Sequence, residues 1–155
     1  MNPLIKTILS TNAGAGLAIL RIVTGLTLMS HGSQKLFGMF GGAGLNGMAQ
    51  WFESIGLTPG YLLATLAGSA EFFGGLALVI GLLVRPASVV VGFTMIVAIF
   101  SVHIGNGFFI TDNGYEYALT LLMISVALLI DGAGKFSLDG FESAEAAVRA
   151  VRDEG

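Results

Sequence analysis

Residues 60–84, GYLLATLAGSAEFFGGLALVIGLLV, decide the fold of this chain. The stretch carries a single charged residue, Glu71. About 20 consecutive apolar residues are enough for a helix to cross the hydrocarbon core of a bilayer. Thr58-Pro59, directly before it, has the form of an N-cap followed by a first-turn proline. The stretch therefore predicts a transmembrane helix.

The composition extends this conclusion to the whole chain of 155 residues, of which 54% are hydrophobic and 11% charged. Soluble domains contain about 25% charged residues. Eight of the charged residues lie within 132–155, so the first 131 residues contain an even smaller share of charge. A disordered chain, a disulfide scaffold and a nucleic-acid module are excluded, and the lack of Cys removes thiolate chemistry. We expect one membrane domain.

Three further spans are predicted at 13–34, 87–104 and 115–130, with Arg85-Pro86 as a turn before the third and Asp112 or Asn113 as the cap of the fourth. A Gly-rich loop, 38–44, follows the first span. The expected fold is an all-α membrane protein with a bundle of four transmembrane helices.

Two short helices complete this fold. Apolar residues recur every three to four positions after the loop (Leu45, Met48, Phe52 and Ile55) beside Trp51, a pattern that favours an interfacial helix between spans one and two. Residues 141–152 are predicted to form a short soluble helix. The domain boundary is therefore placed between a transmembrane domain, 1–140, and an amphipathic tail, 141–155.

Basic residues predict the orientation. In the four-span arrangement, five lie on one side and Lys35 alone on the other; the five are Lys6, Arg85, Lys135, Arg149 and Arg152. The positive-inside rule then places both termini and the tail in the cytoplasm.

This topology gathers polar residues in the outer half of the bundle. The candidate ligand-binding residues are Arg21, His31, Lys35, Glu71, His103, Asn106 and Glu116. If His31 and Pro59 both mark the outer boundary, a rise of 1.5 Å per residue puts Arg21 and Glu71 within about 3 Å of the same depth. Because an unpaired charge at this depth is costly, we predict an Arg21–Glu71 ion pair.

Simpler roles stay open for several of these residues. An Arg21–Glu71 pair would also fix helix register, Lys35 would snorkel to the headgroups, and Glu116 would complement a helix N-terminus. Paired histidines on facing helices are one way to hold haem, but no accompanying motif supports haem or a metal for His31 and His103. A hydrogen-bonding role for the histidines is favoured.

Several motifs together resemble the DoxX family over about residues 16–139: HGSQKLFG (31–38), EFFGGL (71–76), GLLVR (81–85), NGFF (106–109) and GYEY (114–117). The resemblance implies a small four-helix protein of the bacterial plasma (inner) membrane. The wider family includes quinone-reducing membrane subunits of thiosulfate oxidation and members associated with oxidative stress and quinone detoxification. The matching recurrent positions are Arg21, His31, Lys35, Glu71, Arg85, Asn106, Glu116 and Tyr117, whereas His103 belongs to no motif of the family.

The favoured function is a redox-associated membrane protein that binds a quinone-like ligand in the outer half of the bundle, and whether it is itself an oxidoreductase stays open. Arg21 or Lys35 would polarise a carbonyl, and His31 and Glu71 would exchange protons. The alternative is a non-catalytic subunit or anchor whose tail docks a soluble redox partner. A proton-coupled transporter is less favoured, because the sequence has no inverted repeat. The other expected partners are the lipid bilayer and a second copy of the chain.

Overall fold

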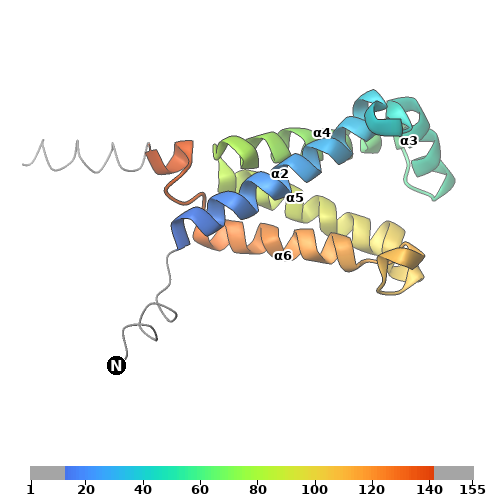
Figure 1. Cartoon of the computed structure of the whole chain (residues 1–155). Coiled ribbons are helices and arrows are strands. Elements are labelled where there is room, and N and C mark those ends of the chain that lie inside the picture. Colours follow the sequence, from blue (N-terminus) through green and yellow to red (C-terminus); the bar gives the residue numbers. More distant parts are fainter. Residues whose placement is uncertain (1–12, 142–155) are drawn as a thin grey trace, which may run out of the picture.

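The computed structural model of the chain describes residues 13–141. Its long helices are α2 (Ala13–Phe37), α4 (Gly60–Ile80), α5 (Val84–Ala98) and α6 (Glu116–Asp131), with the shorter α3 (Gly44–Ser54) between α2 and α4 (Figure 1). A π-helix, η2 (Ile99–His103), continues α5, and single 3-10 turns follow at η3 (Ile104–Asn106) and η4 (Ile110–Asp112), with another, η1 (Met39–Gly41), after α2. No strand occurs in the described range, so the all-α prediction is confirmed.

The helices form two antiparallel pairs, α2 with α4 and α5 with α6 (Figure 1). One end of the bundle carries α3 and the segment 104–115, and we call it the α3 end. The other carries the turn 81–83 and the segment 132–141, and we call it the Gly81 end. The apolar core lies between the two pairs and includes Leu28, Leu78, Val91 and Leu128.

Glycines bring α2 and α4 together at backbone distance. A Cβ at Gly25 would lie 2.5 Å from the Gly75 carbonyl oxygen, and a Cβ at Gly32 would lie 2.5 Å from the Phe72 nitrogen. Small residues permit this close approach between membrane helices. Small residues therefore form the contacting faces of α2 and α4.

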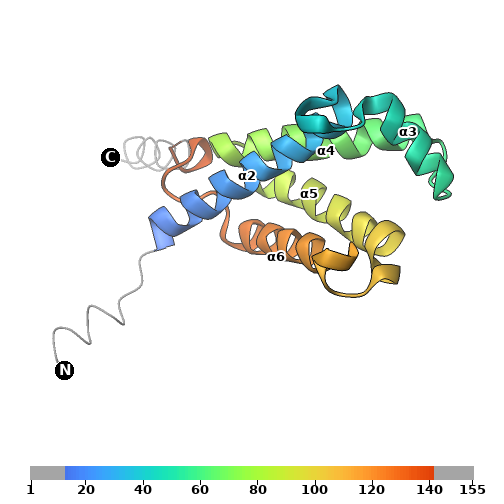
Figure 2. The same cartoon turned by 45° about the vertical axis from the view of Figure 1, so that its right-hand side comes forward.

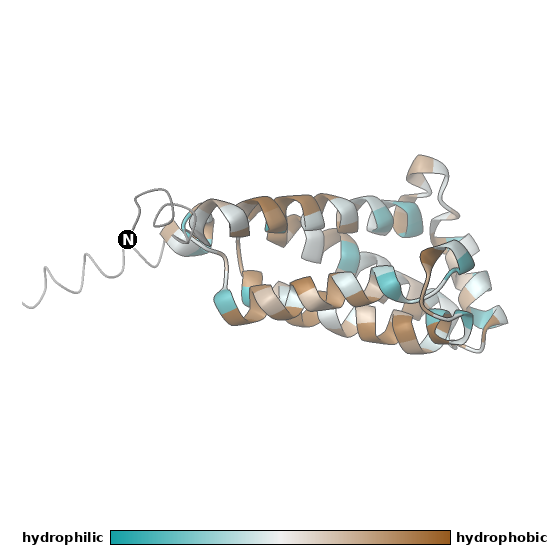
Figure 3. Cartoon of the chain, turned by 60° about the horizontal axis from the view of Figure 1, so that its bottom comes forward, coloured by the Kyte–Doolittle hydropathy of each residue, from teal (hydrophilic) through white to brown (hydrophobic). Residues whose placement is uncertain are grey.

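The lipid-compatible surface lies on the outside of the long helices. Among residues 13–141, three helices are long and apolar enough to cross a membrane: Gly14–Phe37, Gly60–Ile80 and Val84–Asn106. Large apolar side chains are exposed along them, and hydrophilic positions gather toward the ends of the bundle (Figure 3). Helical hydroxyls, such as those of Ser88 and Ser125, donate to carbonyls one turn back in their own helix. This satisfies them without water.

The fourth span stays a prediction, because α6 has 16 residues and is about 24 Å long at 1.5 Å per residue. Helix α3 lies where the short interfacial helix is expected, and its position at the membrane interface stays a prediction. The expected C-terminal helix and nearly all of the tail, residues 142–155, lie outside the described residues.

Several predicted helix ends are wrong by a few residues. Arg85-Pro86 lies inside the first turn of α5 rather than in the preceding turn, which Gly81 forms with φ +73°. Proline is tolerated there because the first-turn amides have no partner within the helix. The N-cap of α4 is Pro59 and not Thr58. Tyr115, rather than Asp112 or Asn113, is the N-cap of α6.

The Gly81 end is closed by hydrogen bonds from charged side chains to the backbone. Arg21 is 1% exposed, and its guanidinium donates to the carbonyls of Leu78 (3.0 Å) and Phe136 (2.6 Å). The Asp139 carboxylate accepts from the amides of Leu83 and Val84, where α5 begins, at 2.8 and 2.9 Å. Arg21 thus caps the end of α4 and Asp139 caps the start of α5, which ties the segment 132–141 to both helices.

Candidate functional site

A cavity of ≈ 1020 Å³ lies between the helix pairs toward the α3 end. Every long helix and α3 contribute to its walls, and most of its lining residues are apolar. Its polar and aromatic-polar lining residues are His31, Gln34, Lys35, Trp51, Glu71, Thr94, Ser101, His103 and Tyr117.

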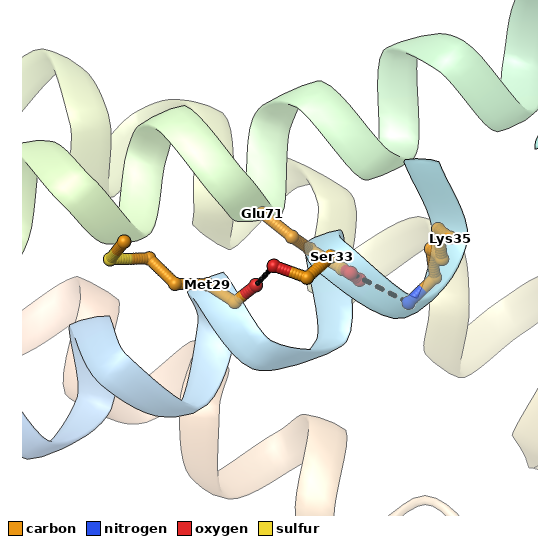
Figure 4. Close-up of polar contacts among 4 residues, drawn as sticks. All are labelled: Met29, Ser33, Lys35 and Glu71. Carbon is orange, nitrogen blue, oxygen red and sulfur yellow. Dashed lines mark hydrogen bonds and ion pairs between the residues drawn. The ribbon is translucent and has the colours of Figure 1, made fainter. Parts of the chain in front are cut away.

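The charged group of the cavity is an ion pair between α2 and α4. The Lys35 ammonium donates to the Glu71 carboxylate at 2.6 Å, with side chains 21% and 8% exposed, respectively (Figure 4). Carboxylate and ammonium thus satisfy each other where neither would be stable alone. The structure thus gives Lys35 a partner within the bundle, and its contact with the headgroups stays a prediction.

The predicted Arg21–Glu71 ion pair is wrong, because Glu71 pairs with Lys35 and Arg21 donates to two backbone carbonyls. Gly32 packs beside Gly68 and Phe72, so Glu71 lies level with residues near Gly32, about 15 Å along α2 from Arg21. Side chains of a helix lean toward its N-terminus. In the antiparallel pair this turns Lys35 and Glu71 toward each other, whereas Arg21 leans toward the Gly81 end. The assumption that His31 and Pro59 lie at the same depth caused the error.

Two further groups face the cavity beside the ion pair. The rings of His31 on α2 and Tyr117 on α6 are in contact, with centroids 5.8 Å apart and planes tilted by 47°. Within residues 13–141, neither the His31 ring nitrogens nor the Tyr117 hydroxyl has a protein hydrogen-bond partner. Both side chains line the cavity. Their polar atoms are therefore available to a ligand.

The remaining predicted residues at the α3 end belong to the rim. The Nδ1 atom of His103 lies 2.8 Å from the Asn113 carbonyl oxygen, to which the Asn106 amide also donates at 3.3 Å. The Glu116 carboxylate accepts from the Ile110 amide at 2.8 Å. Of these, only His103 lines the cavity, while Asn106 and Glu116 hold the loop 104–115 in shape.

The structure thus divides the seven predicted site residues. His31, Lys35, Glu71 and His103 line one cavity, Asn106 and Glu116 order its rim, and Arg21 lies at the opposite end of the bundle. Among the described residues, no group of three His, Cys, Asp or Glu side chains is placed to hold a metal ion.

Sequence reasoning left Tyr117 and Trp51 out of the candidate site. A signal for Tyr117 was present, because it lies on the same face of α6 as the buried residues Leu121, Ser125 and Leu128. Trp51 was assigned to the membrane interface, and it also lines the cavity.

Apolar helices of spanning length, a polar cluster enclosed among them and charged caps at one end define a multi-pass helical membrane protein. Comparison with known proteins identifies the class more closely. The chain belongs to the DoxX family, whose sequence profile matches residues 16–104.

Curated relatives cover most of the chain. It is 32% identical over 126 residues to a Bacillus subtilis protein named "Putative oxidoreductase CatD", a match that covers 81% of this chain and 86% of the relative. It is 32% identical over 130 residues to an uncharacterized protein of Haemophilus influenzae, covering 79% and 87% of the two chains. A second uncharacterized H. influenzae protein is 27% identical over 135 residues, covering 82% and 83%. No solved structure matches the chain significantly.

Proposed function

We propose that this DoxX-family membrane protein binds a quinone-like ligand in the cavity, as a redox-associated component of the bacterial plasma membrane. The observation that supports the proposal is the pairing of unpartnered polar atoms, on His31 and Tyr117, with a buried ion pair inside a largely apolar cavity. Ligand sites of this kind combine apolar walls with a few placed polar groups. The name of the B. subtilis relative agrees with a redox role.

Each polar residue has a defined task in this proposal. The Lys35 ammonium carries three N–H donors, of which Glu71 occupies one, so another is free for a ring carbonyl. The Tyr117 hydroxyl and the His31 imidazole both donate and accept hydrogen bonds, and an imidazole also exchanges protons readily. A bound quinone would supply coupled electron and proton transfer. Arg21, which the sequence offered as an alternative to Lys35, is engaged with two carbonyls elsewhere.

The single tryptophan of the chain gives a direct test, because Trp51 lines the cavity. In nanodiscs, titration with a short-chain ubiquinone analogue should quench Trp51 fluorescence saturably. Glu71→Gln should weaken binding by at least about tenfold, since it removes the charge that orients Lys35. Glu53→Gln is the matched control, because Glu53 is exposed on α3 and outside the cavity lining, and it should leave the affinity unchanged.

A well-folded preparation that shows no saturable quenching and yields no quinone on solvent extraction would contradict the proposal. Equal weakening by Glu71→Gln and Glu53→Gln would also contradict it, because the effect would then not belong to the cavity.

We also propose that α6 is a fourth span and that the Gly81 end faces the cytoplasm. Arg21, Arg85 and Lys135 all belong to the Gly81 end, whereas the charge of Lys35 at the other end is matched by Glu71. The chain contains no Cys, so single cysteines can report topology. A membrane-impermeant maleimide should label Thr111→Cys in intact cells and Leu138→Cys only after permeabilisation. The reverse pattern would contradict the orientation, and labelling of both in intact cells would contradict the fourth span.

A further inference from the structure

We infer that the ligand is a quinone with a long isoprenoid chain, and that it enters from within the bilayer through an opening between α4 and α5. This inference rests on the proposed function, and it adds the ligand's tail and its route. It follows from where the cavity opens between the helices and from how polar and apolar residues are distributed along it.

The opening arises because α4 and α5 diverge. The two helices are joined at the turn 81–83 and touch closely at Gly74, where a Cβ would lie 2.7 Å from Val91 Cγ2. Beyond this contact they separate toward the α3 end (Figure 2). Facing stripes of the two helices line the space between them, including Leu63, Leu66 and Ala70 on α4 and Val90, Phe93 and Val97 on α5.

The mouth of the cavity faces outward on the apolar surface. Leu66 and Phe93 line the cavity and are nevertheless 56% and 66% exposed. Both lie on helices of membrane-spanning length and composition, Gly60–Ile80 and Val84–Asn106. In a bilayer the mouth therefore opens to hydrocarbon rather than to water.

Contacts between helices close the inner side of the cavity, whereas its α3 end is lined by Trp51 and Ile110, which are 40% and 55% exposed. Helix α3 packs on α4 through Phe52 and Ala49. The contact between His31 and Tyr117 bridges α2 and α6 on the side away from the mouth. The ion pair Lys35–Glu71 joins α2 to α4 on the same inner side.

The lining thus changes from apolar at the mouth to polar at the inner end. An amphiphile with a polar ring and an apolar chain matches this order, with the ring near His31 and the chain between Leu66 and Phe93. A chain of isoprene units also remains in hydrocarbon while the ring is bound, so binding does not require it to leave the bilayer. A tail-free, water-soluble ring would make no use of the mouth.

The experiment maps the chain of a bound quinone. A ubiquinone analogue with a diazirine on its isoprenoid tail is photolysed with the wild-type protein in nanodiscs, and the labelled peptides are identified by mass spectrometry. We expect labels on the mouth residues of α4 and α5, and their loss when an excess of unlabelled quinone competes. Labels confined to α2 and α6 would overturn the route.

A narrowed mouth tests the role of the tail. Ala70 lies on the α4 stripe that lines the mouth, and Ala70→Phe should reduce the affinity for a tailed quinone by at least about tenfold while changing that for a tail-free benzoquinone by less than about threefold. The matched control, Ala127→Phe, alters α6 outside the cavity lining and should change neither. Equal effects on both quinones would overturn the inference.

Two outcomes separate the inference from the proposed function. If neither quinone binds the wild-type protein, the proposed function fails. If quinones bind but a diazirine-bearing phospholipid labels the mouth and quinone does not displace it, the mouth is a lipid site and the inference alone fails.

Discussion

Helix α2 carries two inward-facing basic residues, and their surroundings differ in kind. Arg21, at the Gly81 end, is 1% exposed and donates to two backbone carbonyls of other segments. Lys35, toward the α3 end, pairs with the carboxylate of Glu71 at the edge of a large cavity. Both satisfy the requirement that charge within the membrane has a partner. Of the two, only Lys35 has N–H donors that face the cavity.

This difference distinguishes a residue that holds the fold together from a residue of the candidate site. Arg21 donates to carbonyls at the end of α4 and in the segment 132–141, and it therefore links α2 to both of them. Lys35 instead pairs with a carboxylate, and the polar atoms of His31 and Tyr117 line the same cavity. Burial of charge alone therefore does not identify the site; the type of partner does.

The largest effect on stability is expected from Arg21→Met. The substitution removes two charge-assisted hydrogen bonds, each worth about 1.5–3 kcal/mol, so the free energy of unfolding should fall by about 3–6 kcal/mol. SDS-induced unfolding in mixed micelles, followed by Trp51 fluorescence, measures it. Quinone affinity of the folded fraction should be unchanged. A selective loss of affinity with full stability would reverse the assignment of the two ends.

The next effect is expected where α2 and α4 touch. Gly32→Ala places a Cβ 2.5 Å from the Phe72 nitrogen, so α2 must shift, at a cost of about 1–3 kcal/mol. Gly16→Ala is the matched control, because a Cβ there meets nothing within 4 Å. Alanine is the better helix former by about 0.8–1 kcal/mol, so the control should be neutral or stabilising in the same SDS unfolding assay. Equal destabilisation by both changes would contradict the glycine-mediated contact.

The contacting faces of α2 and α4 could be predicted from sequence because helical periodicity alone fixes which residues share a face. Gly25 and Gly32 on α2, like Gly68 and Gly75 on α4, are two helical turns apart, and the structure buries all four between the helices. Periodicity does not fix the axial register of two packed helices, which is how far one is shifted along the other. Their register depends on which glycines meet, and a wrong register paired Arg21 with Glu71.

The inner end of the cavity was predictable only in part for a related reason. His31, Lys35 and Glu71 were identifiable as polar residues in apolar helices. Tyr117 was noted only as a recurrent position of the family, because its contact with His31 depends on how α6 packs against α2. The role of Asp139 was hidden as well, since it caps a helix that begins 55 residues earlier in the chain.

A double-mutant cycle separates the two basic residues directly. Lys35→Met and Glu71→Gln should be coupled by about 1–2 kcal/mol, because each single change leaves the other group without its partner. Arg21→Met and Glu71→Gln should be additive within about 0.5 kcal/mol, since these residues lie far apart. The free energies come from the same SDS unfolding assay. Coupling in the second cycle and none in the first would restore the pairing predicted from sequence.

The smallest effect is expected from the cap of α5. Asp139→Ala removes the acceptor for the amides of Leu83 and Val84, and loss of an N-cap costs about 1 kcal/mol. The segment 132–141 would still be held by Arg21 through Phe136. Asp131→Ala is the matched control, because Asp131 is the last residue of α6, where a negative charge is unfavourable, so its loss should be neutral or slightly stabilising. If the two changes destabilise the protein equally in SDS unfolding, the effect of Asp139 is not that of a cap, and Arg21 alone ties this end together.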